Sequence, residues 1–313
     1  MSKRKAIEKH ENEDVEMESH EEVDDDSGSD GEEDIINVDF EFFDPKEDDF
    51  HAVKNLLGQH FASDALLFAL SELADLVVSQ ANVGTTIKVN GADSDPFSLL
   101  TTLNMNQHLY HHHNSAASGA ASGSSSTPKQ SEVMTQIRDY VFTKSRQNEK
   151  MNMKLKELLG ASSKLQVGLI LSERFINMPA ETAPPMWKMM LDEVNWAIEE
   201  GLPFNFDYFL MLSPTYHEVA PKNDMDDDDS APKPNRKKTK MAEPTVFFMH
   251  PEDEILEQFA EHTHDYKFTT PPSAAESMSS FDDFGIAPGR RMMLIHKSKI
   301  PEVVQLMANM SQE

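Results

Sequence analysis

The sequence predicts a single α/β domain, with a mixed central β-sheet that helices cover on both faces. The first observation is the run at residues 167–171 (VGLIL), which is apolar on both sides, as in a central strand between two layers. The second is an apolar helical stripe, preceded by a cap at Thr182 and by Pro184 and Pro185 in the first turn. The third is that helical and strand patterns are interspersed, with successive strands close enough for antiparallel pairing. The stripe consists of Met186, Trp187, Met190, Leu191, Val194 and Ile198.

A polar corner separates this strand from the helix. Ser172, Glu173 and Arg174 predict that the strand leaves the core there, and residues 177–179 end it. The Glu–Arg pair resembles a catalytic pair, but such a pair at a strand end is more often structural, because it can hydrogen-bond the adjoining backbone. We therefore expect the corner to have a structural role.

The composition limits the size of the folded part and the classes of function. The chain has 313 residues, of which 38% are hydrophobic, a fraction below that of ordinary globular chains. Four polar tracts account for the deficit, so the remainder amounts to about one domain. The absence of cysteine excludes disulfides, thiol catalysis and cysteine-ligated metal. No run suits a signal peptide or approaches the roughly 18 residues of a spanning helix, so we expect a soluble, intracellular protein.

Residues 1–34 begin with the basic Lys3, Arg4 and Lys5 and continue as an acidic tract. The tract has too few apolar residues to offset its ordering entropy, so we expect it to be disordered. It could be a solubilising tail, or a mimic of a polyanion that occupies a basic partner. The net charge of the chain is −27 with histidine neutral. Such a charge disfavours direct binding of nucleic acid or anionic membranes and favours basic proteins.

Residues 35–103 predict a strand, two helices and two further strands. The alternation of Val38, Phe40 and Phe42 with polar residues predicts a half-exposed first strand. A helix is expected after Asp48-Asp49, carrying Val53, Leu56, Leu57 and His60/Phe61, and a second helix opens at Ser63-Asp64. Residues 83–89 and 96–103 are expected to form strands around an Asn90-Gly91 turn. The second helix should present one apolar face, made of Leu66, Leu67, Leu70, Leu73 and Val77.

The second part of the chain predicts further helices and strands around the central unit. Residues 131–159 form a helical pattern that Asn148 interrupts. An apolar strand at residues 204–212 is expected to stop at Ser213-Pro214. The remaining elements are strands at 245–249, 266–268 and 290–296, a helix at 252–259, and a closing helix from Pro301.

Three segments are predicted as low-complexity or irregular insertions, at residues 104–130, 221–244 and 270–283. The first contains His111, His112 and His113, but adjacent histidines in an unstructured tract lack the fixed geometry of a metal site, so we expect none. The second joins an acidic block to a basic block. The basic block is either a nuclear-localisation signal or a neutralising partner of the acidic block. Its basic residues include Arg236, Lys237, Lys238 and Lys240.

The motifs of the whole chain resemble those of the BCCIP family, eukaryotic nuclear proteins that include the essential yeast member. The matching segments are residues 36–41, 48–57, 279–283 and 291–295. The most specific is the signature Ser172, Glu173, Arg174, Phe175, Ile176, Asn177 and Pro179. The resemblance covers residues 35–312 but not the tail or the inserts at 104–130 and 221–244.

The resemblance implies a single α/β domain similar to the GNAT acetyltransferase fold, without its cofactor site or its activity. It also implies a nuclear chaperone or adaptor that binds a ribosomal protein of the large subunit and supports ribosome biogenesis and nuclear export. Such a protein would meet import and export receptors, be nuclear with some cytoplasmic presence, and in animals also bind cell-cycle and DNA-repair regulators.

The residues agree with a binding protein that needs no cofactor. Acetyltransferases of the GNAT type hold the pyrophosphate of their cofactor on a glycine-rich turn after the central strand. Here residues 177–185 contain three prolines, no glycine and the carboxylate of Glu181. Residues 285–291 offer two glycines and two arginines, but we expect them to form a turn before an edge strand rather than a phosphate site. A divergent acyl-CoA-dependent transferase stays as the alternative.

Overall fold

The computed structural model describes residues 39–80, 82–110, 130–218, 245–270 and 286–310. The chain divides between Val38 and Asp39, and the compact unit described below begins at Asp39. The three histidines at 111–113 and all seven nuclear-import candidates (Lys3, Arg4, Lys5, Arg236, Lys237, Lys238 and Lys240) lie outside the described residues.

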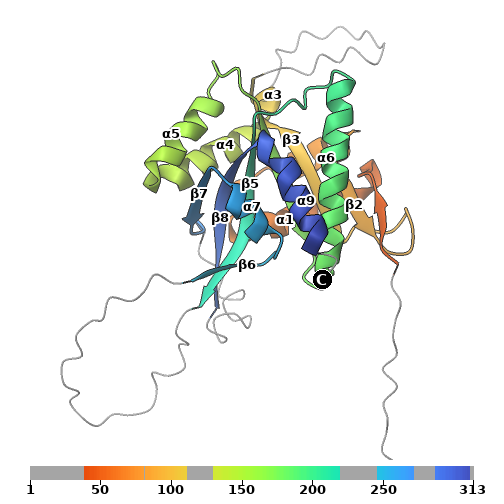
Figure 1. The fold of residues 1–313 in the computed structure, drawn as a ribbon. Coiled ribbons are helices and arrows are strands. Elements are labelled where there is room, and N and C mark those ends of the chain that lie inside the picture. The colour runs from red at the N-terminus through yellow and green to blue at the C-terminus, as the bar shows by residue number, and fades with distance from the viewer. Residues whose placement is uncertain (1–38, 81, 111–129, 219–244, 271–285, 311–313) are drawn as a thin grey trace, which may run out of the picture. The chain divides into compact units, whose positions relative to one another are not determined.

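The described residues form one eight-stranded mixed sheet (Figure 1). The order of the strands is β1-β2-β3-β4-β5-β8-β7, and β6 also pairs with β5. All these pairs are antiparallel except β4 with β5, which run parallel. The strands are β1 (Glu41–Phe43), β2 (Thr85–Lys88), β3 (Ser98–Asn104), β4 (Val167–Arg174), β5 (Tyr208–Glu218), β6 (Val246–Phe248), β7 (His262–Tyr266) and β8 (Ile286–His296).

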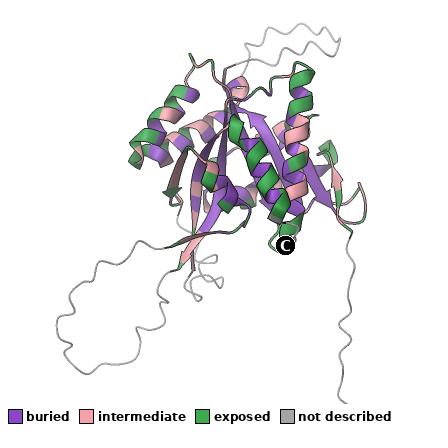
Figure 2. Cartoon of the chain, viewed as in Figure 1, coloured by how far each residue is buried: buried purple, intermediate pink, exposed green. Residues whose placement is uncertain are grey.

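Helices cover both faces of the sheet, as the sequence predicts. Alternate side chains of β4 separate the two layers: Leu169 and Leu171 pack with the first group of helices, and Ile170 packs with the second. Strands β3 and β4 are buried throughout, and β5 is buried from Tyr208 to Thr215 (Figure 2). The first group is α1 (Phe50–Phe61), α2 (Leu70–Val78), α3 (Met105–Tyr110), α4 (Glu132–Lys144) and α5 (Glu149–Leu158), and the second is α6 (Ala183–Glu199), α7 (Asp253–Phe259) and α9 (Ile300–Met310).

The parallel pair at the centre of the sheet is short. β4 and β5 pair only from Val167↔Tyr208 to Ile170↔Met211. Beyond that point β4 continues beside β3, whereas β5 continues beside β8 and takes up β6 at residues 215–217. The two central strands therefore diverge at the carboxyl end of β4, which is a common place for a binding crevice in α/β sheets.

Pro214 lies in β5 at this divergence, and the expected end of the strand at Ser213-Pro214 is wrong. The Pro214 carbonyl accepts a hydrogen bond from the Met249 backbone on the β6 side. Proline has no backbone N–H, and the position of this missing donor is on the same side, where β4 no longer pairs with β5. The hydrogen bonds between β5 and β8 are therefore all retained. Strand β5 consequently runs on to Glu218.

Several local predictions are confirmed. The helical pattern at residues 131–159 is interrupted at Asn148, between α4 and α5. The structure adds that Ser131 and Asn148 cap these helices, each accepting a hydrogen bond from the backbone N–H three residues later. Asn90 and Gly91 both have positive φ at the turn between β2 and β3. Pro184 and Pro185 lie in the first turn of α6, although the Thr182 hydroxyl donates to Pro179 O instead of capping the helix.

Other local predictions are wrong because tertiary packing decided them. The second helix begins only at Leu70, and a 3₁₀ segment at Ala62–Leu67 leaves Leu66 94% exposed and Leu67 partly exposed. Ala197, not Ile198, closes the buried stripe of α6. The expected strand at 266–268 lies earlier, as β7, and residues 104–110 belong to β3 and α3 rather than to an insertion.

The segment at residues 286–291 is also different from the expectation. It is part of β8, which lies between β5 and β7, so it is neither a turn nor an edge strand. Among the helices that the structure describes, none combines the length and apolar character needed to span a bilayer.

Candidate functional site

A groove of about 860 Å³ lies at the divergence of β4 and β5. It is lined by the end of β4 and the loop that follows, by Pro214 and Thr215 of β5, and by residues 249–251 between β6 and α7. The C-terminal end of α1 and residues 288–290 of β8 complete the lining. Segments that are distant in sequence therefore meet here and form a concave surface.

The rim of the groove is apolar. Phe175 and Ile176 follow β4 directly, and Ile176 is 92% exposed. Met249, directly after β6, also lines the groove and is 38% exposed, and Phe97 packs edge-to-face against Phe175. An isoleucine and a phenylalanine held in water beside a concavity are typical of a surface that binds another molecule.

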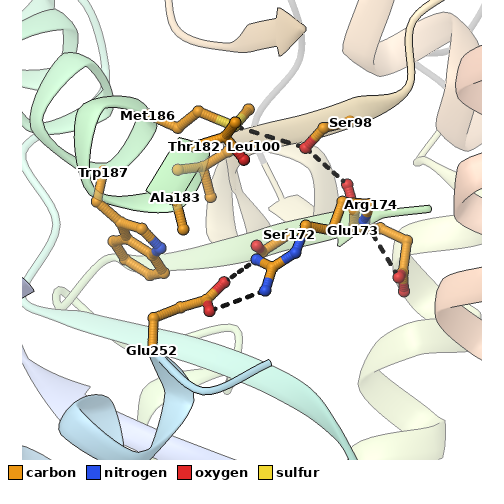
Figure 3. A pocket seen from close by; sticks show the side chains of 10 residues that line it. All are labelled: Ser98, Leu100, Ser172, Glu173, Arg174, Thr182, Ala183, Met186, Trp187 and Glu252. Atoms are coloured by element: carbon orange, nitrogen blue, oxygen red, sulfur yellow. Dashed lines mark hydrogen bonds and ion pairs between the residues drawn. The ribbon is translucent and has the colours of Figure 1, made fainter. Parts of the chain in front are cut away.

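The groove is also lined by the polar residues Gln59, Glu173, Arg174, His250 and Arg290. We call these residues, together with His60, Glu252 and Asp253, the floor; the last three contact lining residues but do not line the groove themselves. The main feature of the floor is an ion pair between Arg174 and Glu252. The guanidinium of Arg174 donates to both carboxylate oxygens of Glu252, with Nη2 3.1 Å from Oε2. Both side chains are buried, so the pair crosses from β4 to the start of α7 in a low-dielectric setting (Figure 3). The sequence prediction that the strand leaves the core at residues 172–174 is therefore wrong: partners from other elements keep β4 buried to its end.

Glu173 is the centre of a second group on the floor. Its Oε1 accepts hydrogen bonds from Gln59 Nε2 at 2.8 Å and from the Arg174 backbone at 3.2 Å. His60 Nδ1 lies 3.5 Å from Oε2, and His250 Nε2 lies 3.7 Å from Oε1. Burial would raise the pKa of Glu173, but the contact with His60 and the charges of His250 and Arg290 bring it below its ordinary value. Glu173 is thus a buried carboxylate that stays ionised.

His250 and Asp253 have the opposite tendency, since both favour their uncharged forms. Burial lowers the pKa of His250, and the charge of Arg174 adds to this effect, although Glu173 opposes it. Burial and the charge of Glu252 raise the pKa of Asp253 well above its ordinary range. Asp253 accepts a hydrogen bond from the Ser213 hydroxyl.

Unpaired polar atoms gather in this floor. Both ring nitrogens of His60, Nδ1 of His250 and Oδ1 of Asp253 are buried and have no hydrogen bond of normal geometry with any described residue. Buried polar atoms without partners are rare in proteins and usually accompany function or a bound molecule. Of these three residues His250 lines the groove, whereas His60 and Asp253 lie against lining residues, so the floor has spare hydrogen-bonding capacity next to the groove.

The donors fit a metal ion poorly. His250, Glu252 and Asp253 each offer a buried ligand atom within 4.8 Å of the others. However, both oxygens of Glu252 are already bound by Arg174, so a cation would have to replace or repel a guanidinium. The donor set is better explained as a neutralised network, and we assign no metal to it.

The arginines near the groove are also bound within the protein. Arg290 Nη2 donates to the carbonyls of His60 and Gln59, at 2.6 and 3.2 Å, in the last turn of α1. A cation is favourable there, because the C-terminal end of a helix is negative. Arg291 binds Asp265 and Glu257. Neither side chain is available as a simple phosphate clamp.

A much smaller cavity, of about 10 Å³, lies next to the groove and shares Glu173 and Arg174 with it. Figure 3 shows it between the end of β4, Ser98 of β3 and the first turns of α6 with Trp187. Such a space holds about one water molecule and no organic ligand.

The structure brings together some of the signature residues from the sequence but gives them different positions. Glu173 and Arg174 are on the floor, and Phe175 and Asn177 line the groove, while Ser172 faces the small cavity. Pro179 precedes the 3₁₀ turn before α6 and ends the loop. Glu173 and Arg174 do not pair with each other; each has partners from distant elements, and a purely structural role for them stays a prediction.

Sequence reasoning missed the residues that complete the floor: Gln59, His60, His250, Glu252 and Arg290. Apart from the contact of His250 with Asp253, their partners in the floor lie between 77 and 231 positions away in the chain, so no local pattern joins them. The one available signal was the polar run from His250 to Asp253 before an apolar helix, which reads as an ordinary helix start.

The fold and the groove define a class: a single-domain mixed α/β protein with a groove where its central parallel strands diverge. The family model for BCCIP matches residues 35–119 and 124–256. Protein bcp1 of Schizosaccharomyces pombe is 37% identical over 87% of the chain and 91% of that protein, and protein bcp1 of Aspergillus fumigatus is 38% identical over 97% of both. The chain belongs to the BCCIP family.

A solved structure shows the same fold. The crystal structure of BCP1 from Saccharomyces cerevisiae matches with a TM-score of 0.55 and 22% identity, over 92% of this chain and 98% of that one. The names of the family and of these relatives indicate no enzymatic activity. The expected likeness to the GNAT acetyltransferase fold is not confirmed by these matches.

Proposed function

We propose that this protein is a non-enzymatic nuclear chaperone or adaptor that holds a basic client, a ribosomal protein of the large subunit, and so supports ribosome biogenesis and nuclear export. The observation that carries the proposal is the groove, with its exposed apolar rim over a floor whose charges already have partners. Such a site suits an apolar segment of another protein better than a charged metabolite. Membership of the BCCIP family and the net charge of −27 add support.

The rim provides the binding energy for the client. A ribosomal protein carries surfaces meant for RNA phosphate, and before assembly these bind any polyanion nonspecifically. The acidic chain attracts such a client from a distance, and the groove then excludes water around its apolar anchors. Ile176 and Met249, which both line the groove and are both exposed, are its apolar anchors.

The experiment compares the binding of purified large-subunit ribosomal proteins to the wild-type protein and to Ile176→Asp. We expect affinity to fall by about tenfold or more, mainly through faster dissociation, as for an interface hot spot. Met153→Asp is the control, since Met153 is an exposed methionine on α5 outside the groove. If Ile176→Asp and Met153→Asp bind the client equally well, the groove is not the client site.

Calorimetry with acetyl-CoA tests the enzymatic alternative. The floor offers no unpaired cation for the cofactor phosphates, because Arg174 and Arg290 both have partners among the described residues. We therefore expect no heat of binding. Saturable binding of acetyl-CoA at the groove would favour a transferase.

The proposed location is the nucleus, with some cytoplasmic presence. The basic clusters at Lys3, Arg4 and Lys5 and at Arg236, Lys237, Lys238 and Lys240 are the candidates for binding an import receptor. Replacing both clusters by alanine should leave a fluorescently tagged protein in the cytoplasm. An unchanged nuclear signal would indicate another route, such as entry bound to a partner.

A further inference from the structure

The outer face of α6 presents a tryptophan to solvent. Trp196 is 62% exposed, whereas Trp187, the other tryptophan of the chain, is 1% exposed. The buried stripe of α6 runs through Met186, Trp187, Met190, Val194 and Ala197 and does not include Trp196. The core therefore does not need this indole, and exposed residues line the outer side of the helix (Figure 2). Tryptophan is one of the residues most enriched in the energetic centres of interfaces.

Carboxylates surround Trp196 at helical spacing. Asp192 is four positions before it, and Glu199 and Glu200 are three and four positions after it, so all three lie on its side of the helix. Asp192 forms an exposed ion pair with Lys188, and Glu200 accepts a hydrogen bond from Asn82. Glu199 makes no hydrogen bond or ion pair with any residue that the structure describes.

The position of these carboxylates is unfavourable for the helix itself. The C-terminal end of a helix is negative and favours cations, yet α6 has no basic residue in its last turn. Glu199 ends the helix, and Glu200 follows as its C-cap residue. A local arrangement that disfavours folding is more typical of a functional surface than of a stabilising one. It also creates a site where an added positive charge would be stabilised by the carboxylates and by the helix end together.

We propose that the Trp196 surface, made of Asp192, Trp196, Glu199 and Glu200, is a docking site for an arginine-bearing segment of a basic protein. The planar guanidinium stacks on the indole face and at the same time donates paired hydrogen bonds to carboxylates. Lysine can supply the charge but not the paired donors or the stacking. The carboxylates repel nucleic acid and anionic lipid, and a second copy of this chain would bring the same negative charge. This inference deepens the proposed function, because it supplies a contact for a basic client outside the groove.

The test uses the full-length protein and two peptides, octa-arginine and octa-lysine. Because Trp187 is buried, quenching of tryptophan fluorescence by acrylamide reports on Trp196. We expect octa-arginine to protect Trp196 from acrylamide at physiological salt, with severalfold higher affinity than octa-lysine. Trp196→Phe should remove the fluorescence that octa-arginine protects from acrylamide, and this loss would assign the protected signal to Trp196. Glu199→Gln/Glu200→Gln should weaken protection by about threefold or more, since two charge-assisted contacts are lost.

The matched control is Glu149→Gln/Glu157→Gln on α5, which removes the same net charge from another exposed helix. It should leave protection by octa-arginine nearly unchanged. Binding of the peptide without protection of Trp196 would overturn the proposal, because the acidic tracts would then hold it. Equal protection by both peptides, or equal loss in both double variants, would also overturn it. None of these outcomes involves the groove, so failure here and failure of the Ile176→Asp experiment are distinguishable.

Discussion

At the scale of single residues, the ion pair with Glu252 is what allows the charged side chain of Arg174 to be buried at the end of β4. The desolvation of two charges is offset only while both are present, so loss of one partner leaves the other charge buried and unpaired. Glu252→Gln should lower the free energy of unfolding by about 3–5 kcal/mol, measured by urea denaturation. Glu254→Gln, at an exposed position in α7, should change it by less than about 0.5 kcal/mol.

A double variant separates the charge effect from a general loss of packing at the same site. Arg174→Met/Glu252→Met replaces the pair by apolar side chains of similar volume, which is often close to neutral for a buried ion pair. Its stability should therefore exceed that of Glu252→Gln. If it is as unstable as the single variant, packing and not charge limits this site.

His250 should determine part of the pH dependence of stability. In the folded protein its pKa is below the ordinary 6.5. As pH falls below 6.5, His250 therefore binds a proton in the unfolded chain before it does so in the folded protein, and the free energy of unfolding decreases. Glu173 acts at lower pH: its contribution is present above 4.5 and is lost as pH falls through its lowered pKa. The contribution of Asp253 to the free energy of unfolding has the opposite pH dependence: it is present at low pH, where the carboxyl is protonated, and is lost as pH rises through the raised pKa.

His250→Gln should therefore flatten the loss of stability between about pH 6.5 and 5, measured by urea denaturation at several pH values. His51→Gln is the control, since His51 is an exposed histidine on α1. The explanation fails if both variants keep the slope of the wild type.

At the scale of elements, Gly168 fixes how closely β4 approaches its neighbours. A Cβ at this position would lie 2.8 Å from Thr102 Cγ2 and 3.1 Å from the Phe206 ring. Gly168→Ala should therefore destabilise the protein by about 1–3 kcal/mol through overpacking. Gly58→Ala in α1 should stabilise it by about 0.5–1 kcal/mol, because the nearest atom is 3.9 Å away and alanine favours helix. Thermal denaturation of both variants measures the two signs.

Element by element, the sequence predicted what local chemistry controls. The apolar run of β4, the break between α4 and α5 at Asn148 and the prolines in the first turn of α6 are properties of neighbouring residues, and they were predicted correctly. The second helix was wrong because a leucine pattern cannot show that Asp64 is held by the backbone of Thr269 and Thr270, more than 200 positions away.

At the scale of the whole molecule, the sequence predicted the layers but not the groove. The layers follow from apolar periodicity, whereas the groove depends on β4 and β5 separating after residue 170 and on β6 taking the vacated side of β5. Nothing in the pattern of β5 signals a change of neighbour except Pro214, which was read as a strand end. The residues of the floor meet only because of this topology.

The acidic tract at residues 1–34 should act on the rate of client binding. Attraction between exposed charges is screened beyond about 8 Å at physiological salt, so the tract guides encounter more than it holds the complex. Deleting residues 1–34 should slow association and weaken its salt dependence, while dissociation changes little; stopped-flow binding measures both. If the isolated tract binds the client as tightly as the whole chain, the folded domain is not the binding partner.

The shortness of the β4–β5 pairing has a mechanical consequence. Four residue pairs join these strands, against seven between β3 and β4 and eleven between β5 and β8. The sheet thus consists of two extensively hydrogen-bonded halves, β1 to β4 and β5 to β8, which are joined by the short β4–β5 pairing as a hinge. The helices on each face pack against both halves. Amide hydrogens at the hinge should exchange with solvent through partial openings of lower free energy than those between β5 and β8. A molecule bound in the groove would lie where β4 and β5 diverge, and it would fix the angle between the two halves of the sheet.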